Sequence, residues 1–167
     1  MKRTMQVSDS VDIKVDAETI WTQLADPAQM PRWSPENTGA TTPAVGRPLQ
    51  VGEIFEGTNR RGRARWIPRC VVTASDPGRR FAFDVGRIGV RRPMLRGRIA
   101  SWAYDLDDVD GGTRVTETWT DGRSKWPDWL AGAFDRAVTG GQLFAEFQRK
   151  NIRRTLNTMR GEFEHDG

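Results

Sequence analysis

The sequence is poor in the residues on which most metal and nucleophile sites depend. It contains one cysteine, Cys70, and one histidine, His165, which lies two residues from the end. Neither a zinc site nor a Ser-His or Cys-His nucleophile can be assembled from them. We therefore expect no metal. A lone cysteine also forms no internal disulfide and is typical of a reducing compartment, so we expect a cytoplasmic protein.

Long apolar runs and glycine-rich phosphate loops are also missing. No segment approaches the roughly twenty apolar residues of a membrane-spanning helix, and the N-terminus lacks the apolar stretch of a signal peptide. No strand-loop-helix motif for a nucleotide phosphate is present, so no cofactor is expected. A length of 167 residues fits one soluble domain, residues 1–167, with no integral membrane segment.

Arginine, by contrast, is abundant and spread along the chain, and the formal net charge is +4. Within residues 60–69, strand alternation places Arg63, Arg65 and Arg69 on the face opposite Trp66. These side chains are expected to form a solvated outer surface. Because neither a dense basic patch with interleaved aromatics nor a nucleic-acid-binding motif is evident, nucleic acid is not an expected partner.

The first third of the chain predicts a strand followed by two short helices. Residues 5–15 alternate between apolar and polar, which is the period of a half-buried strand. Asp16 occupies an N-cap position before a helical repeat, and Asp26-Pro27 begins a second helix that reaches Trp33. Residues 37–52 are rich in Thr, Pro and Gly and predict an exposed loop with at most one brief strand.

The middle of the chain predicts antiparallel strands. Residues 53–59 and 62–74 flank Arg60-Arg61, and a turn there would place Phe55 opposite Trp66. Another strand follows at 81–85. The Gly- and Arg-rich segment 86–97 predicts a mobile connection or a frayed edge strand.

The clearest hairpin runs from Arg98 to Thr120, with its turn at residues 110–112. Setting Asp108 opposite Thr113 pairs three sets of side chains on one face, which we assign to the interior: Leu106 with Val115, Tyr104 with Glu117, and Trp102 with Trp119.

The remainder predicts helices. Residues 127–138 form a short helix or lid, Gly140-Gly141 interrupts it, and a longer helix covers 142–163. Its buried stripe contains apolar residues together with Gln148, Asn151 and Thr155. The element order predicts an α+β fold in which a curved antiparallel sheet wraps around the long C-terminal helix.

Three stretches carry a family resemblance: residues 13–21 followed by Asp26-Pro27 and Arg32-Trp33, residues 110–119, and residues 151–156. They resemble the START-like (SRPBCC) superfamily, and within it the polyketide cyclase/dehydrase and lipid-transport branch. The resemblance implies a helix-grip fold with a deep hydrophobic cavity. It does not imply one chemistry, because members include aromatases and cyclases, lipid or hormone binders, and chaperone-interacting modules.

Glu117 is the first candidate for chemistry, because alternation places its carboxylate on the inward face. A buried carboxylate needs a hydrogen-bond donor, and Tyr104 across the hairpin or Arg98 along the same face could serve. Such a group acts as a general base or orients a ligand carbonyl. The alternatives are a structural carboxylate and one that reaches solvent at the cavity mouth.

The ligand-binding candidates are ring and polar side chains of the inward faces, and their competing interpretation is core packing or a solvated helix rim. They are Trp33, Phe55, Trp66, Phe83, Trp102, Trp119, Phe144, Phe147, Gln148, Asn151 and Thr155.

Three functional hypotheses follow, for a monomer or homodimer. The first is a binding protein that holds a small hydrophobic or aromatic molecule, such as a lipid or polyketide, in the cavity. The second is a cofactor-independent cyclase, aromatase or dehydratase that uses Glu117 with Tyr104 or Arg98. The third is an interaction module with a vestigial cavity, whose basic outer face binds an acidic partner.

Overall fold

A computed structural model describes residues 2–165 of the chain, apart from the side chain of Leu95. Its strands and helices, in chain order, are β1 (Gln6–Ile13), α1 (Ala17–Leu24), the 3-10 helix η1 (Pro27–Arg32), β2 (Asn37–Thr41), β3 (Ile54–Arg61), β4 (Ala64–Asp76), β5 (Arg80–Gly89), β6 (Leu95–Val109), β7 (Gly112–Asp121), α2 (Asp128–Thr139) and α3 (Phe144–His165).

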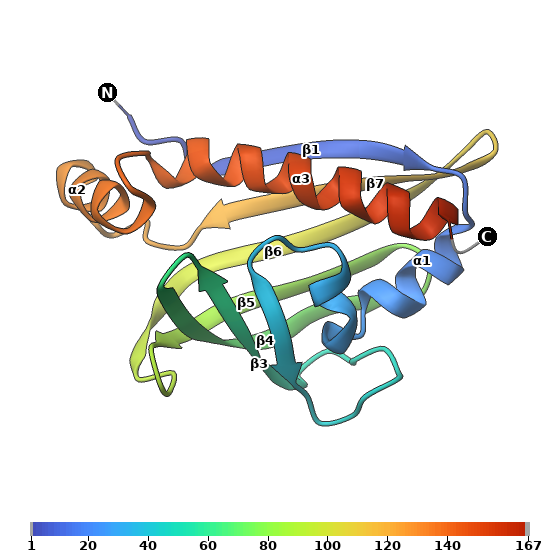
Figure 1. The fold of residues 1–167 in the computed structure, drawn as a ribbon, viewed down its shortest axis with the longest axis horizontal. Coiled ribbons are helices and arrows are strands. Elements are labelled where there is room, and N and C mark those ends of the chain that lie inside the picture. Colours follow the sequence, from blue (N-terminus) through green and yellow to red (C-terminus); the bar gives the residue numbers. More distant parts are fainter. Residues whose placement is uncertain (1, 166–167) are drawn as a thin grey trace.

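The strands form one seven-stranded antiparallel sheet in the order β1-β7-β6-β5-β4-β3-β2. The sheet curves around α3, which lies over β1 and β7, while α1 and η1 lie at the end nearest the C-terminus of α3 (Figure 1). The α+β helix-grip arrangement predicted from the sequence is confirmed.

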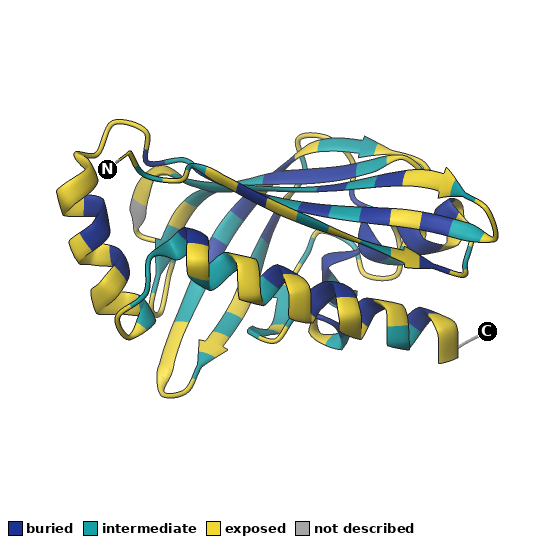
Figure 2. Ribbon diagram, turned by 90° about the horizontal axis from the view of Figure 1, so that it is seen from above, coloured by how far each residue is buried: buried dark blue, intermediate teal, exposed yellow. Residues whose placement is uncertain are grey.

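The β6–β7 hairpin has the predicted register. Tyr104 is the Cα partner of Glu117, and Trp102 is the partner of Trp119. Thr113, Val115, Glu117, Trp119 and Asp121 are buried, and the residues between them are not. Figure 2 shows such alternation of burial along the strands of the sheet. The inner face assigned from alternation is therefore the buried face.

The predicted register of the β3–β4 hairpin is wrong. Arg61 pairs with Ala64, so the turn lies at Gly62-Arg63, and Phe55 is opposite Cys70 instead of Trp66. Gly62 has a φ of +57°, which a residue without a Cβ adopts at little cost. The turn forms at this glycine because a two-residue hairpin loop needs such a conformation.

The prediction of a mobile connection or edge strand at 86–97 is also wrong. β5 continues to Gly89 and β6 begins at Leu95, and Arg87 pairs with Arg96 in the interior of the sheet order. A Cβ at Gly89 would lie 1.7 Å from the carbonyl oxygen of Arg92. The glycine thus serves a tight turn between paired strands.

The core lies between the inner face of the sheet and the buried stripe of α3. Ile152, Leu156, Met159 and Phe163 supply that stripe. At its C-terminal end the ring of Phe163 stacks on Trp33 with 5.8 Å between centroids. This contact fixes the end of α3 against the segment that follows η1.

Candidate functional site

Glu117 and Tyr104 form a buried hydrogen-bonded pair on the inner face of the sheet. Tyr104 Oη donates to Glu117 Oε1 at 2.8 Å, and the two residues are 6% and 2% exposed. Their strands position them directly, because they are Cα partners in the β6–β7 ladder. The contact predicted from the sequence is present, and its chemical role stays a prediction.

Burial determines the protonation of this pair. It raises the pKa of the Glu117 carboxyl to about 8, although the Tyr104 hydrogen bond partly opposes that rise. Burial and the neighbouring carboxyl hold the pKa of Tyr104 well above its usual value. Glu117 is therefore mostly protonated at neutral pH, which suits a hydrogen-bond donor or general acid better than the general base considered first.

The second carboxyl oxygen of Glu117 is left unpaired by the rest of residues 2–165. Among the described residues, Oε2 is buried and has no hydrogen-bond partner. Because Oε1 already accepts a hydrogen bond from Tyr104, a proton on Oε2 would be free to donate to an acceptor on the inner face of the sheet. A buried polar atom without a partner is costly, so a ligand oxygen at this position would stabilise the protein.

Arg98 does not join the pair. It is exposed, and it lies six positions before Tyr104 in β6. At the rise of a strand this is a distance of about 20 Å. The last β6–β7 pair is Ala100 with Asp121, so Arg98 lies on the part of β6 that extends beyond β7. Alternation predicts the face of a residue but not its distance from a partner.

Asp9 and Arg153 are neighbours of the pair that the sequence analysis missed. Asp9 is the β1 partner of Glu117, and its Oδ2 lies 2.6 Å from Nε of Arg153 on α3. The bridge ties α3 to β1 beside the buried carboxyl. An aspartate between Val7 and Val11 on the inward face of β1 was the signal available in the sequence.

The predicted ligand-binding residues are all buried or partly buried, and several of their rings contact one another. Phe55 packs edge-on against Phe83 at 5.1 Å between centroids, and Trp119 packs against Phe144 at 6.4 Å. Trp33 serves the core through its stack on Phe163, yet its Nε1 is buried without a partner among the described residues. Ligand contact at these residues stays a prediction.

Two further predicted ligand-binding rings, those of Trp66 and Phe147, lie beneath the guanidinium of Arg61. Arg61 lies over the rings of Trp66 and Phe147, at 5.2 and 3.8 Å from their centroids, and its Nε lies 2.5 Å from Glu36 Oε1. Part of the face of each ring is therefore covered by the Arg61 side chain in a cation–π contact.

The polar residues predicted on α3 contact one another in part. Asn151 Nδ2 donates to Gln148 Oε1 at 3.4 Å, and both residues are partly buried. Thr155 is buried.

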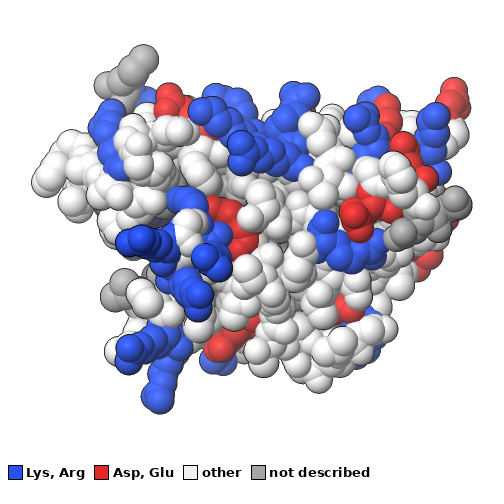
Figure 3. Space-filling view, in the orientation of Figure 1, with Lys and Arg blue, Asp and Glu red and all other residues white. Residues whose placement is uncertain are grey.

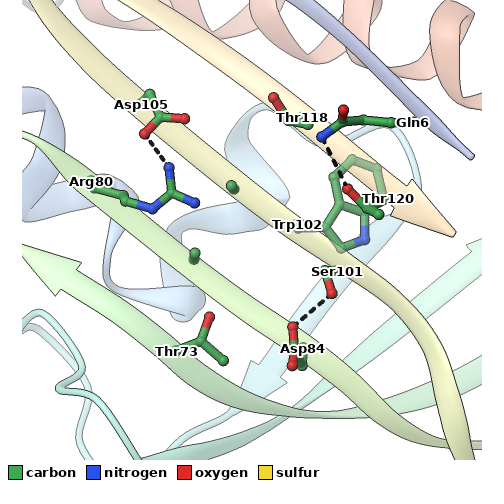
Figure 4. A pocket seen from close by; sticks show the side chains of 11 residues that line it. Gln6, Thr73, Arg80, Asp84, Ser101, Trp102, Asp105, Thr118 and Thr120 are labelled. Atoms are coloured by element: carbon green, nitrogen blue, oxygen red, sulfur yellow. Dashed lines mark hydrogen bonds and ion pairs between the residues drawn. The ribbon is translucent and has the colours of Figure 1, made fainter. Parts of the chain in front are cut away.

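Two surface hollows in the described part of the chain lie elsewhere. One, of about 280 Å³, is lined mostly by polar side chains, and Trp102 is the only predicted ligand residue among those that line it (Figure 4). Its polar groups bind one another, as in the 2.7 Å hydrogen bond from Ser101 Oγ to Asp84. The other, of about 670 Å³, lies beside the start of α1 and the β4–β5 turn. Neither hollow is bordered by Glu117 or Tyr104.

A second buried charged group, also missed, connects β7 to the C-terminal helices. Arg123 binds Asp121 through Nε and Nη2 at 3.0 and 2.8 Å, and Asp135 on α2 through Nη1 at 2.7 Å. Asp135 Oδ2 also accepts from the backbone N–H of Phe144, at the start of α3. Since every partner belongs to the fold itself, this group is structural.

A seven-stranded antiparallel sheet curved around a long C-terminal helix defines the class of helix-grip proteins. The model of the polyketide cyclase/dehydrase and lipid transport family matches residues 4–164, and the chain belongs to that family. No curated protein matches the chain.

Solved structures share the fold. A START superfamily protein from Mycobacterium smegmatis has a TM-score of 0.69 and 13% identity, covering 98% of this chain and 100% of its own. A Polyketide_cyc-like protein from Corynebacterium glutamicum has a TM-score of 0.59 and 21% identity, covering 99% and 95%. A protein from Nitrosomonas europaea has a TM-score of 0.69 and 12% identity, covering 99% and 98%.

Proposed function

We propose that this protein binds a small hydrophobic or aromatic molecule between the sheet and α3, and that Glu117 donates a hydrogen bond to an oxygen of that molecule. Membership of a family that includes lipid-transport proteins supports a hydrophobic ligand. The observation that carries the proposal is the buried Oε2 of Glu117, which has no partner among residues 2–165.

The chemistry of the site favours a ligand with an acceptor oxygen. A protonated carboxyl donates through Oε2 while Tyr104 holds Oε1. Trp33 Nε1, the other predicted site atom that is buried without a described partner, is also a donor. A ketone, ester or phenol on an otherwise apolar skeleton, as in polyketides and acyl lipids, meets this requirement.

Replacing Glu117 in two ways tests the proposal. Glu117→Gln keeps a donor N–H₂ at the same place, so it should bind a carbonyl-bearing aromatic ligand as tightly as the wild type at pH 6. Glu117→Met removes the donor and should weaken binding roughly tenfold or more. Tryptophan fluorescence against paired ligands with and without the carbonyl measures the affinity, and native mass spectrometry identifies the molecule that co-purifies.

The pH dependence separates the proposed hydrogen bond from simple hydrophobic binding. Above a pKa of about 8 the wild-type carboxylate faces the acceptor oxygen, and affinity should fall about tenfold by pH 9. The affinity of Glu117→Gln should show no such fall. The control Glu146→Gln, at an exposed residue of α3, should lose affinity with rising pH to the same extent as the wild type. Equal affinity of Glu117→Met and wild type would refute the proposal.

A second candidate function is dehydration or cyclisation of a bound polyketide-like substrate. It is favoured by the raised pKa of Glu117 beside the Tyr104 hydroxyl, since a buried acid of this kind can protonate a leaving hydroxyl. Water departs as the C–O bond breaks, and the resulting carboxylate takes the proton from the adjacent carbon. If this function holds, Glu117→Gln binds substrate but turns none of it over.

A further inference from the structure

Exposed apolar side chains gather along α2 and at Trp126, two residues before the helix begins. Trp129 is 75% exposed, and Leu130, Phe134 and Val138 are each 41–44% exposed. These three recur at a spacing of four residues, which places them along one side of the helix. Trp126, before the helix, is 39% exposed. The buried residues of α2 are Ala131, Gly132 and Asp135.

The fold holds this apolar face in a fixed orientation. Arg123 binds Asp135, and Asp135 binds the first N–H of α3, so α2 is anchored at its buried side. At its C-terminal end, Arg61 Nη1 donates to the carbonyl oxygen of Val138 at 3.1 Å. Trp126 packs edge-on against Phe134, and Phe134 against Phe144, with 5.7 and 6.3 Å between centroids, so the exposed parts of these rings are held in place. The outer side of the anchored helix, at Trp129 and Leu130, has no covering element among the described residues.

The β5–β6 and β3–β4 turns lie at the same end of the molecule (Figures 1 and 2). The β5–β6 turn carries two exposed apolar side chains, Val90 at 74% and Met94 at 79%. The exposed arginines of the two turns and of the strand ends that flank them are Arg60, Arg63, Arg65, Arg87, Arg91, Arg92, Arg96 and Arg98. Residues 57–70 and 86–98 contain no Asp or Glu.

Charge and apolar surface thus meet at this end of the molecule, where Lys and Arg gather beside the uncharged surface of α2 (Figure 3). We propose that this end, made of α2 and the two turns, docks on the surface of an anionic membrane. Tryptophan, leucine and phenylalanine side chains of a surface helix enter the interface between headgroups and acyl chains. Arginines around them are attracted by anionic lipid headgroups.

Other occupants fit this surface less well. Nucleic acid would use the arginines and would stack on aromatic rings, but it offers no apolar medium for Leu130, Val138 or Met94. A second copy of the chain would set arginine-rich turns against one another. The contact is peripheral, because within residues 2–165 every helix is too short or too polar to cross a bilayer.

Vesicle flotation tests the proposal. The full chain should float with vesicles of phosphatidylcholine and phosphatidylserine and stay behind with vesicles of phosphatidylcholine alone. Trp129→Ser with Leu130→Ser should reduce the bound fraction roughly tenfold or more. Because these side chains are exposed, the thermal unfolding midpoint should not change. The matched control, Val45→Ser with Val51→Ser, changes exposed apolar residues on the loop between β2 and β3 and should bind like the wild type.

The charges are tested separately. Arg91→Gln with Arg92→Gln should weaken binding to the anionic vesicles by about fivefold for each arginine removed. Arg154→Gln with Arg160→Gln, on the exposed side of α3, removes the same charge and should have much less effect. Glu117→Met should float like the wild type, so failure of the ligand proposal would be distinguishable from failure of this one.

Three results would overturn the membrane proposal. The first is that the protein does not float with the anionic vesicles, and the second is that it floats equally well with neutral vesicles. The third is that the Trp129→Ser, Leu130→Ser variant binds anionic vesicles as well as the wild type does. Tighter binding to duplex DNA or to an acidic peptide than to the anionic vesicles would point to a different partner and would also count against it.

Discussion

Glu117 should make the stability of the folded protein depend on pH. Its carboxyl has a pKa of about 8 in the folded chain because it is buried, whereas in the unfolded chain it titrates near 4.5. Below pH 4.5 both states hold the proton and its contribution is fully present. Between pH 4.5 and 8 only the folded state holds it, so the free energy of unfolding falls by up to about 1.4 kcal/mol per pH unit.

Urea unfolding at several pH values between 5 and 9 measures this effect, with Glu117→Gln as the reference. The difference in unfolding free energy between the two proteins should change steadily up to pH 8 and then level off. Glu56→Gln, at a partly exposed carboxyl beside Arg69, should run parallel to the wild type. Parallel curves for Glu117→Gln and wild type would show that Glu117 is ionised in the folded protein.

The sequence predicts some of this site and not the rest, for a physical reason. Glu117 and Tyr104 meet because a turn and strict alternation determine which residues face each other across a hairpin. Arg98 shares their face but lies too far along the strand. Arg61 and Arg153 make their contacts only after distant elements have packed, and local patterns in the sequence carry no signal for that packing.

At the scale of elements, Arg123 should be the residue that holds α2 in place. Replacing it with Met leaves Asp135 buried without its cation, while Asp121 keeps Arg3 at 3.5 Å. Removing one partner of a buried ion pair costs roughly 3–5 kcal/mol. We expect Arg123→Met to lower the free energy of unfolding by about that amount and to open residues 126–140 to limited proteolysis.

Arg114→Met is the matched control, because Arg114 forms an exposed pair with Asp12 at 2.8 Å. Because solvent screens an exposed pair, its loss should leave both the free energy of unfolding and the protease pattern nearly unchanged. Similar losses in the two variants, or an intact α2 in Arg123→Met, would show that helix packing alone anchors α2.

The elements themselves were largely predictable, and the exceptions depend on glycine. The β6–β7 hairpin and the long helix follow from periodicity. In β3–β4 the polar Arg60-Arg61 pair favours a turn, but the glycine that follows it is the residue able to adopt positive φ. In residues 86–97 the glycines favour a break in the sheet, whereas Gly89 permits a close backbone approach within a paired hairpin.

At the scale of the whole molecule, the two proposed surfaces are separate. The proposed ligand position is on the inner face at Glu117, and the proposed membrane surface is on the outside, on α2 and the turns. The architecture was predictable because one amphipathic helix and alternating strands leave few ways to bury both apolar faces. The exposed face of α2 was not anticipated, because a helix with so many apolar residues predicts burial.

The alkylation rate of the Cys70 thiol measures whether the sheet unfolds as one cooperative unit. It lies in β4 between Phe55 of β3 and Val85 of β5 and is 1% exposed, and burial raises the pKa of its thiol. Alkylation should therefore proceed only through opening of the sheet, and its rate should rise with urea as steeply as global unfolding does. Cys70→Ala with Val45→Cys, a thiol on an exposed loop, should react at the rate of an unfolded chain without urea. A shallower dependence for Cys70 would mean that β3 and β4 separate from the sheet while the rest stays folded.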